Sequence, residues 1–179
     1  KRQINDLIKI FKNILLSNIP GVPSKLVLIG KDFTKATGSK IKPKNERADR
    51  VLRELKSQGI LHNVITTDRV SDEDLTILIQ QAYCYFNFSK YEGFSFGPLQ
   101  AMASKVPVIV GGYSCIPEVT DGGAFLVDSA NIQKTTQDIQ IYLADENMQA
   151  ELIEKGRAVA ERYDWEVAAT KTWNAIQSL

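Results

Sequence analysis

The sequence predicts a doubly wound α/β fold, in which helices cover both faces of a mainly parallel sheet. Apolar runs of four to six residues alternate with amphipathic segments of ten or more, the pattern of strands joined by helical crossovers. Glycine or proline marks most of the junctions. With 179 residues and neither an internal repeat nor a linker, the chain is expected to form a single domain over residues 1–179.

The first part of the chain is expected to begin with a helix and continue into a strand. Apolar residues recur at helical spacing over residues 4–16, with lysines between them, and Pro20 lies just beyond. The apolar run 25–30 ends on glycine and predicts a short buried strand. A polar stretch over 31–45 then leads into a helix near 46–58, which a following glycine ends.

The middle of the chain repeats this alternation. Residues 62–67 predict a second strand. Ser71 is placed to cap a helix over 72–82, with Asp74 as the acidic residue three positions later. The apolar residues 83–88 predict a third strand.

The last part of the chain is expected to add two strands and then only helices. Pro98 suits the first turn of a helix that carries residues 99–103. We expect strands at 107–110 and 124–127, a helical turn at 116–120, and helices at 131–143, 147–162 and 165–178.

Parallel sheets bind ligands outside the carboxyl ends of their strands, so the loops that follow the strands are the places to look for a site.

Composition and charge exclude several classes of protein. The chain has 22 basic and 21 acidic residues and a net charge of +1, which argues against nucleic acid as a partner. Cys84 and Cys115, with a single histidine, predict reduced thiols rather than a disulfide or a metal site, and so a reducing compartment. No apolar run approaches the ~18 residues that span a bilayer. We therefore expect a cytoplasmic protein.

The most informative stretch is the loop expected before the fourth helix, residues 89–97. Gly93 and Gly97 allow the backbone to turn tightly and approach a ligand, next to a helix N-terminus that favours phosphate. Glu92 and Gln100 are placed to face the same cleft, and a carboxylate accepts hydrogen bonds from two sugar hydroxyls. On spacing alone, a purely steric corner between strand and helix is the alternative.

The same stretch resembles the group 1 (family 4) glycosyltransferases, which are retaining enzymes of the two-domain GT-B architecture. The resemblance extends over nearly the whole chain and is strongest over residues 89–109. It implies that the chain is the C-terminal, Rossmann-like half, which binds the donor. The matching residues are Ser89, Glu92-Gly93-Phe94, Leu99, Ala101-Met102-Ala103, Pro107-Val108-Ile109, Pro117-Glu118-Val119, Asp121-Gly122 and Tyr163-Asp164-Trp165.

The resemblance implies a site for a nucleotide-sugar donor, such as a UDP-, GDP- or ADP-sugar, with no metal cofactor. Glu92 would contact the transferred hexose as the catalytic carboxylate, while Gln100 stands where the family has the glutamate that binds the ribose. Arg2 lies nearest the position of a lysine that clamps the diphosphate. The donor-binding loop implied by position comprises Gly93, Phe94, Ser95, Phe96 and Gly97.

The resemblance also implies that part of the enzyme lies outside this chain. The family's first strand, which is central in the sheet, would precede residue 1, so we expect unpaired strand edges on both sides of its place. An absent N-terminal domain would bind a glycan or lipid-linked acceptor, and the isolated chain is expected to transfer little. The alternative is a non-catalytic nucleotide- or partner-binding module, which glutamine at position 100 leaves open.

Several other signals point to structure rather than chemistry. Residues 72–74, Asp-Glu-Asp, follow a capping serine and predict a helix N-terminus instead of a metal site. His62 is expected at the surface, without a role as a general base. Five lysines between 31 and 44 predict a solvated face; the alternatives are steering of the donor, or peripheral contact with the inner face of a membrane. Trp165 and Trp173 are expected in the core or at a docking surface.

Overall fold

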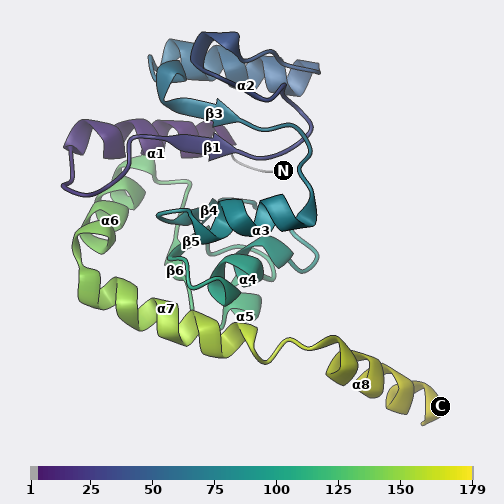
Figure 1. Cartoon of the computed structure of the whole chain (residues 1–179). Coiled ribbons are helices and arrows are strands. Elements are labelled where there is room, and N and C mark those ends of the chain that lie inside the picture. The colour runs from purple at the N-terminus through teal and green to yellow at the C-terminus, as the bar shows by residue number, and fades with distance from the viewer. Residues whose placement is uncertain (1–3, 179) are drawn as a thin grey trace.

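Six short strands in the described part of the chain form two sheets of three (Figure 1). The computed structural model describes residues 4–178. The first sheet has the order β1-β3-β2 and the second has the order β4-β5-β6. The strands are β1 (Leu26–Leu28), β2 (Ala36–Thr37), β3 (Val64–Thr66), β4 (Tyr85–Asn87), β5 (Val108–Gly111) and β6 (Phe125–Val127).

The helices lie where the sequence predicts them, within a few residues at each end. Ser71 accepts a hydrogen bond from the backbone N–H of Asp74 at 3.1 Å, so it caps α3 as predicted. Asn45 and Asp145 cap α2 and α7 in the same way. The helices are α1 (Ile4–Ser17), α2 (Glu46–Ser57), α3 (Asp72–Gln80), α4 (Phe96–Ala103), α5 (Ile116–Thr120), α6 (Ile132–Ala144), α7 (Glu146–Ala160) and α8 (Trp165–Gln177), with 3₁₀ turns η1 (Gly38–Lys40) and η2 (Leu61–Asn63).

Pairing within the sheets is parallel except at β2. In the first sheet Leu26 lies beside Val64, and in the second Ile109 lies between Phe86 and Phe125. The five strands predicted from the sequence are all present, although each is shorter than its apolar run or shifted by a residue. The prediction of an α/β fold built on mainly parallel sheets is confirmed.

Strand β2 is not predicted from the sequence. It lies inside the polar stretch 31–45 and pairs antiparallel with β3. Phe33 and Ile41 anchor this stretch in the core, where both are buried. The Thr66 hydroxyl also donates a hydrogen bond to the Thr34 carbonyl at 2.7 Å. The basic loop is therefore folded against the first sheet rather than being extended in solvent.

The two sheets face each other at β1 and β4, each of which has a single neighbour among the described strands. The expectation of unpaired edges on both sides of a central position is confirmed. Residues of both strands line one cavity of about 520 Å³, together with residues of α1 and α3. The separation of the fold into two half-sheets therefore coincides with a hollow inside the domain.

The C-terminal helix α8 extends away from the rest of the domain (Figure 1). Trp165 is 77 % exposed and Trp173 is 59 % exposed, so of the two predicted places, the core or a docking surface, the core is excluded. Their helix follows α7 through residues 161–164, and none of the α8 residues is buried. None of the helices described by the structure is long and apolar enough to cross a membrane.

Candidate functional site

Three loops meet at the carboxyl ends of the second sheet. The Glu92 loop (residues 88–95) follows β4, the Tyr113 loop (residues 112–115) follows β5, and residues 128–131 follow β6. Side-chain hydrogen bonds connect the Tyr113 loop to both of the others. This edge of a parallel sheet is where ligands bind, so the three loops form one candidate site.

Asn87 fixes both ends of the Glu92 loop. Its side-chain oxygen accepts a hydrogen bond from the backbone N–H of Ser89 at 2.9 Å. Its amide nitrogen donates to the hydroxyl of Ser95 at 3.1 Å. Ser95 has a φ of 73°, in the left-handed region, and stands immediately before α4. Asn87 is not predicted as a site residue from the sequence, although a polar amide at the end of an apolar strand is a signal that could have identified it.

Glu92 is held through its backbone rather than through its carboxylate. The Glu92 carbonyl oxygen accepts hydrogen bonds from the Ser114 hydroxyl at 3.1 Å and from the Cys115 thiol at 3.2 Å. Among residues 4–178 the half-buried carboxylate makes no hydrogen bond or ion pair. The loop is thus fixed in place while the acidic group is left available to a ligand.

The two glycines of the predicted binding motif have different surroundings. A Cβ added to Gly93 would meet nothing within 4 Å, so the loop is bordered by open space at this position. A Cβ added to Gly97 would collide with the Tyr85 hydroxyl and lie 3.1 Å from the ring carbon that carries it. Gly97 therefore permits close packing of α4 on β4, whereas Gly93 borders space that a ligand can occupy.

The aromatic side chains of the motif contact the C-terminal segment. Phe94 packs edge-on against Tyr163, with ring centroids 5.4 Å apart. Phe96 stacks on Trp165 at 6.1 Å, and the two phenylalanine rings lie 4.9 Å from each other. Phe94 and Phe96 can therefore contribute to a ligand site chiefly through their backbone N–H groups.

The N-terminus of α4 provides unpaired backbone donors at the same place. The first N–H groups of a helix have no partner within the helix, and here they belong to Phe96 and Gly97. Ser95 makes no side-chain capping bond to them. Pro98 lacks an N–H but fits this first turn, as predicted. Gln100 lies one turn into the helix with an exposed side chain.

A second polar contact links the loops after β5 and β6. The Tyr113 hydroxyl hydrogen-bonds to the carboxylate of Asp128. This bond, together with the backbone N–H of Ala130, holds the pKa of Asp128 below its usual value. The ammonium group of Lys90 lies 5.9 Å from the centre of the Tyr113 ring. The sequence does not predict this cluster, because its members are distant along the chain.

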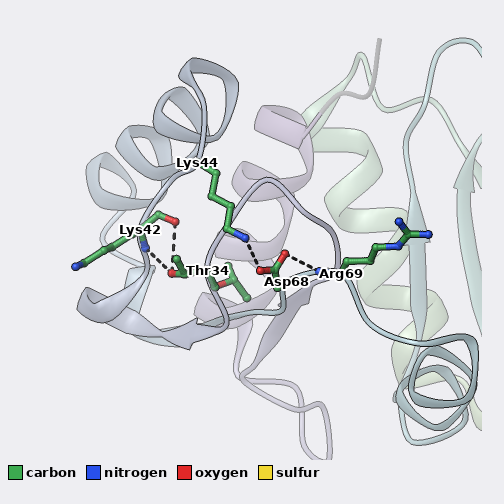
Figure 2. Close-up of polar contacts among 6 residues, drawn as sticks. Thr34, Lys42, Lys44, Asp68 and Arg69 are labelled. Atoms are coloured by element: carbon green, nitrogen blue, oxygen red, sulfur yellow. Dashed lines mark hydrogen bonds and ion pairs between the residues drawn. The ribbon is translucent and has the colours of Figure 1, made fainter.

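The lysine-rich stretch, residues 31–44, contacts residues that follow β3 at the carboxyl end of the first sheet (Figure 2). Lys44 forms an ion pair with Asp68, which also accepts a hydrogen bond from the backbone N–H of Arg69 at 2.8 Å. Lys44 is the main reason that the pKa of Asp68 is lowered. The Thr34 hydroxyl accepts from the backbone N–H of Lys42 at 3.1 Å. The other lysines of the stretch have exposed side chains, which agrees with the predicted solvated face.

The remaining candidate groups are placed as follows. Residues 72–74 form the first turn of α3, and no group of three metal-ligating side chains occurs among the described residues. His62 is exposed in η2. Cys84 and Cys115 are free thiols. Arg2 lies outside the residues that the structure describes.

Comparison with known proteins decides the family. The sequence matches the family "Glycosyl transferases group 1" over residues 1–159. The chain belongs to the group 1 glycosyltransferases. It is 32% identical over 110 residues to the O-antigen chain mannosyltransferase B of Escherichia coli, covering 62% of this chain and 29% of that protein. It is 32% identical over 138 residues to the MMP alpha-(1->4)-mannosyltransferase of Mycolicibacterium hassiacum, covering 75% and 33%. This glycosyltransferase chain thus spans about a third of these relatives.

Solved structures agree on the fold of this glycosyltransferase chain. Sucrose-phosphate synthase from Thermosynechococcus elongatus matches 99% of the chain with a TM-score of 0.78 and 19% identity, over 42% of its own length. Anabaena HepE in complex with UDP-glucose matches 95% with a TM-score of 0.74 and 18% identity, over 44% of its length. The predicted Rossmann-like half of a GT-B glycosyltransferase is confirmed at the level of the fold.

Proposed function

We propose that this glycosyltransferase chain binds a nucleotide-hexose donor and provides the donor half of a retaining transferase. The observation that carries the proposal is Glu92, whose backbone is fixed by Ser114 and Cys115 while its carboxylate has no partner among the described residues. A carboxylate in this state accepts hydrogen bonds from sugar hydroxyls without first breaking a bond inside the protein. The similarity to two mannosyltransferases supports a hexose as the transferred sugar.

In this proposal the diphosphate lies at the N-terminus of α4. The N–H groups of Phe96 and Gly97 and the positive end of the helix dipole favour negative charge there. As the bond between sugar and diphosphate breaks, charge accumulates on the leaving diphosphate, and fixed donors stabilise it most at that moment. Glu92 orients the sugar, and the open space beside Gly93 admits the donor. Neither step requires a metal ion.

We further propose that the acceptor, a glycan or a lipid-linked sugar, is bound by a part of the enzyme outside residues 1–179. The matched relatives are about three times as long as the region they share with this chain. A GT-B enzyme closes two domains over its donor, so the chain alone should bind nucleotide weakly and transfer little. Calorimetry with UDP, GDP and ADP, each with and without an attached hexose, tests the proposal. Failure to bind any of them would refute it.

Gln100 provides a sharper test of donor binding. Gln100→Glu should tighten binding of the preferred nucleotide about five- to tenfold, since a carboxylate forms a stronger, charge-assisted bond to the ribose hydroxyls. The same substitution should not change the affinity for the corresponding 2′,3′-dideoxynucleotide, which lacks those hydroxyls. Equal effects on both ligands would show that position 100 does not face the ribose.

The two donors to the Glu92 carbonyl are expected to act as positioning residues. The double substitution Ser114→Ala with Cys115→Ala removes both hydrogen bonds and should weaken nucleotide-sugar binding about tenfold. Binding of the free nucleotide should change less, because the diphosphate contacts α4. The matched control is Cys115→Ser, which keeps a donor at the same position and should retain nearly full affinity. If the control loses as much affinity as the double variant, the hydrogen bonds are not the cause.

A further inference from the structure

The Tyr113 loop holds Glu92, and a second contact holds the Tyr113 loop. The Ser114 hydroxyl and the Cys115 thiol fix the carbonyl oxygen of Glu92. The residue before them, Tyr113, donates a hydrogen bond from its hydroxyl to the carboxylate of Asp128. Because Tyr113 is next to Ser114 in the chain, this bond limits how far the donors to Glu92 can move.

Asp128 is a fixed partner for this bond, because helix α6 holds its backbone. The carbonyl oxygen of Asp128 accepts hydrogen bonds from the Thr135 hydroxyl at 2.6 Å and from the backbone N–H of Asn131 at 3.0 Å. Thr135 lies in the first turn of α6 and is buried. The Asp128 carboxylate also accepts from the backbone N–H of Ala130 at 3.1 Å. Both ends of Asp128 are therefore set in position, and the Tyr113 hydroxyl is tied to them.

The ring of Tyr113 has two further neighbours. A Cβ added to Gly111 would lie 2.9 Å from a ring carbon, so glycine at this position lets the ring lie directly on the end of β5. The ammonium group of Lys90, which belongs to the Glu92 loop, lies 5.9 Å from the ring centre, near the limit of a cation–π contact. The hydroxyl bond to Asp128 is therefore the strongest directional contact of this ring.

We propose that Tyr113 and Asp128 are positioning residues for the donor sugar, because their bond connects α6, through the Tyr113 loop, to the backbone of Glu92. The inference rests on the proposed function, since it concerns the same carboxylate. In the proposed complex the two residues touch neither the sugar nor the diphosphate and act only through Glu92. A change at either residue should weaken sugar binding and leave nucleotide binding nearly unchanged, which a general loss of stability would not do.

The first experiment needs no ligand and follows the rate at which dithionitrobenzoate modifies Cys115. This thiol is half-buried against the Glu92 carbonyl, so its rate reports how firmly the loop is held. Burial raises the pKa of Cys84 to about 12, so the second thiol reacts slowly near neutral pH. Tyr113→Phe keeps the ring and removes the hydroxyl, and it should raise the Cys115 rate about fivefold or more. Asp128→Ala should have a similar effect.

Three further variants show whether the bond itself is the cause. Asp128→Asn keeps an oxygen acceptor for the hydroxyl, so its rate should stay within about twofold of that of the unaltered chain. Tyr113→Phe combined with Asp128→Ala should react no faster than Asp128→Ala alone, because both changes remove the same bond. The matched control is Asp138→Ala, which removes a carboxylate of α6 whose ion pair, at 2.7 Å, is with Lys134 on the same helix. It should leave the rate unchanged.

Calorimetry with the UDP-, GDP- or ADP-hexose that binds most tightly completes the test. Tyr113→Phe should weaken binding of this ligand about five- to tenfold, and binding of the sugar-free nucleotide less than about twofold. An unchanged Cys115 rate, additive effects in the double variant, unchanged hexose binding, or equal weakening of both ligands would each overturn the inference. If the unaltered chain binds no nucleotide-hexose, the proposed function fails, and the thiol rates still decide whether the bond holds the loop.

Discussion

Replacing Glu92 with glutamine is expected to weaken binding of the nucleotide-hexose about 10- to 100-fold. The substitution keeps the size of the side chain and the hydrogen bonds that Ser114 and Cys115 make to the backbone carbonyl. It removes the negative charge that strengthens hydrogen bonds from sugar hydroxyls. Binding of the nucleotide without its sugar should change less than about twofold, since in the proposed complex the diphosphate contacts α4. Calorimetry with the sugar-bearing and sugar-free nucleotide measures both values.

The matched control for this result is Glu151→Gln. Glu151 is an exposed carboxylate on α7 whose ion pair with Lys155 lies at the surface, and such pairs contribute little. This variant should bind both ligands like the unaltered chain. If Glu92→Gln weakens the sugar-free nucleotide as much as the nucleotide-hexose, then Glu92 does not contact the sugar and its assignment is wrong.

Gly123→Ala is expected to have the largest effect on stability, lowering the free energy of unfolding by about 3 kcal/mol. A Cβ at this position would lie 2.6 Å from the Cα of Gly156 and 2.9 Å from its backbone nitrogen. Both atoms belong to the backbone of α7, which cannot rotate away as a side chain can. The turn and the helix would have to separate, and the core between α4, α5 and α7 would open.

Urea unfolding followed by circular dichroism measures this loss. Gly112→Ala is the matched control, because its added Cβ would meet only the Val127 carbonyl oxygen, at 4.0 Å. Its backbone is not in the left-handed region, so the control should unfold near the midpoint of the unaltered chain. Equal midpoints for the two variants would show that α7 can move away from the turn at little cost.

The course of the backbone follows closely from the sequence. Short apolar runs between amphipathic segments give the five predicted strands, and Ser71 marks the start of α3 as its position predicts. Strand β2 could not be predicted in this way, because a strand of two residues, Ala36 and Thr37, is too short to show the alternation of a strand. Its formation depends on the burial of side chains elsewhere in the same loop. The exposure of α8 could not be predicted either, because an apolar stripe on a helix does not show which surface it packs against.

The candidate site is only partly visible in the sequence. Spacing and resemblance point to Glu92 and to the loop before α4. They do not reveal that Ser114 and Cys115 hold the Glu92 carbonyl, since these residues are more than 20 positions away and meet the loop only after β4 and β5 pair. Nor do they reveal that Gly97 faces the Tyr85 ring, because a glycine in a motif looks the same whether it borders a ligand or a ring.

The stacking of Phe96 on Trp165 provides an optical probe of the donor loop. Trp165 and Trp173 are the two tryptophans of the chain, and both are on α8. The indole of Trp165 touches the residue whose backbone begins α4, whereas Trp173 lies two turns further along an exposed helix. Intrinsic emission from Trp165 therefore depends on the conformation at the entrance of the site, and Trp173, two turns away on the same helix, supplies a reference. A Trp173→Phe variant would turn the native chain into a single-fluorophore sensor that needs no attached dye.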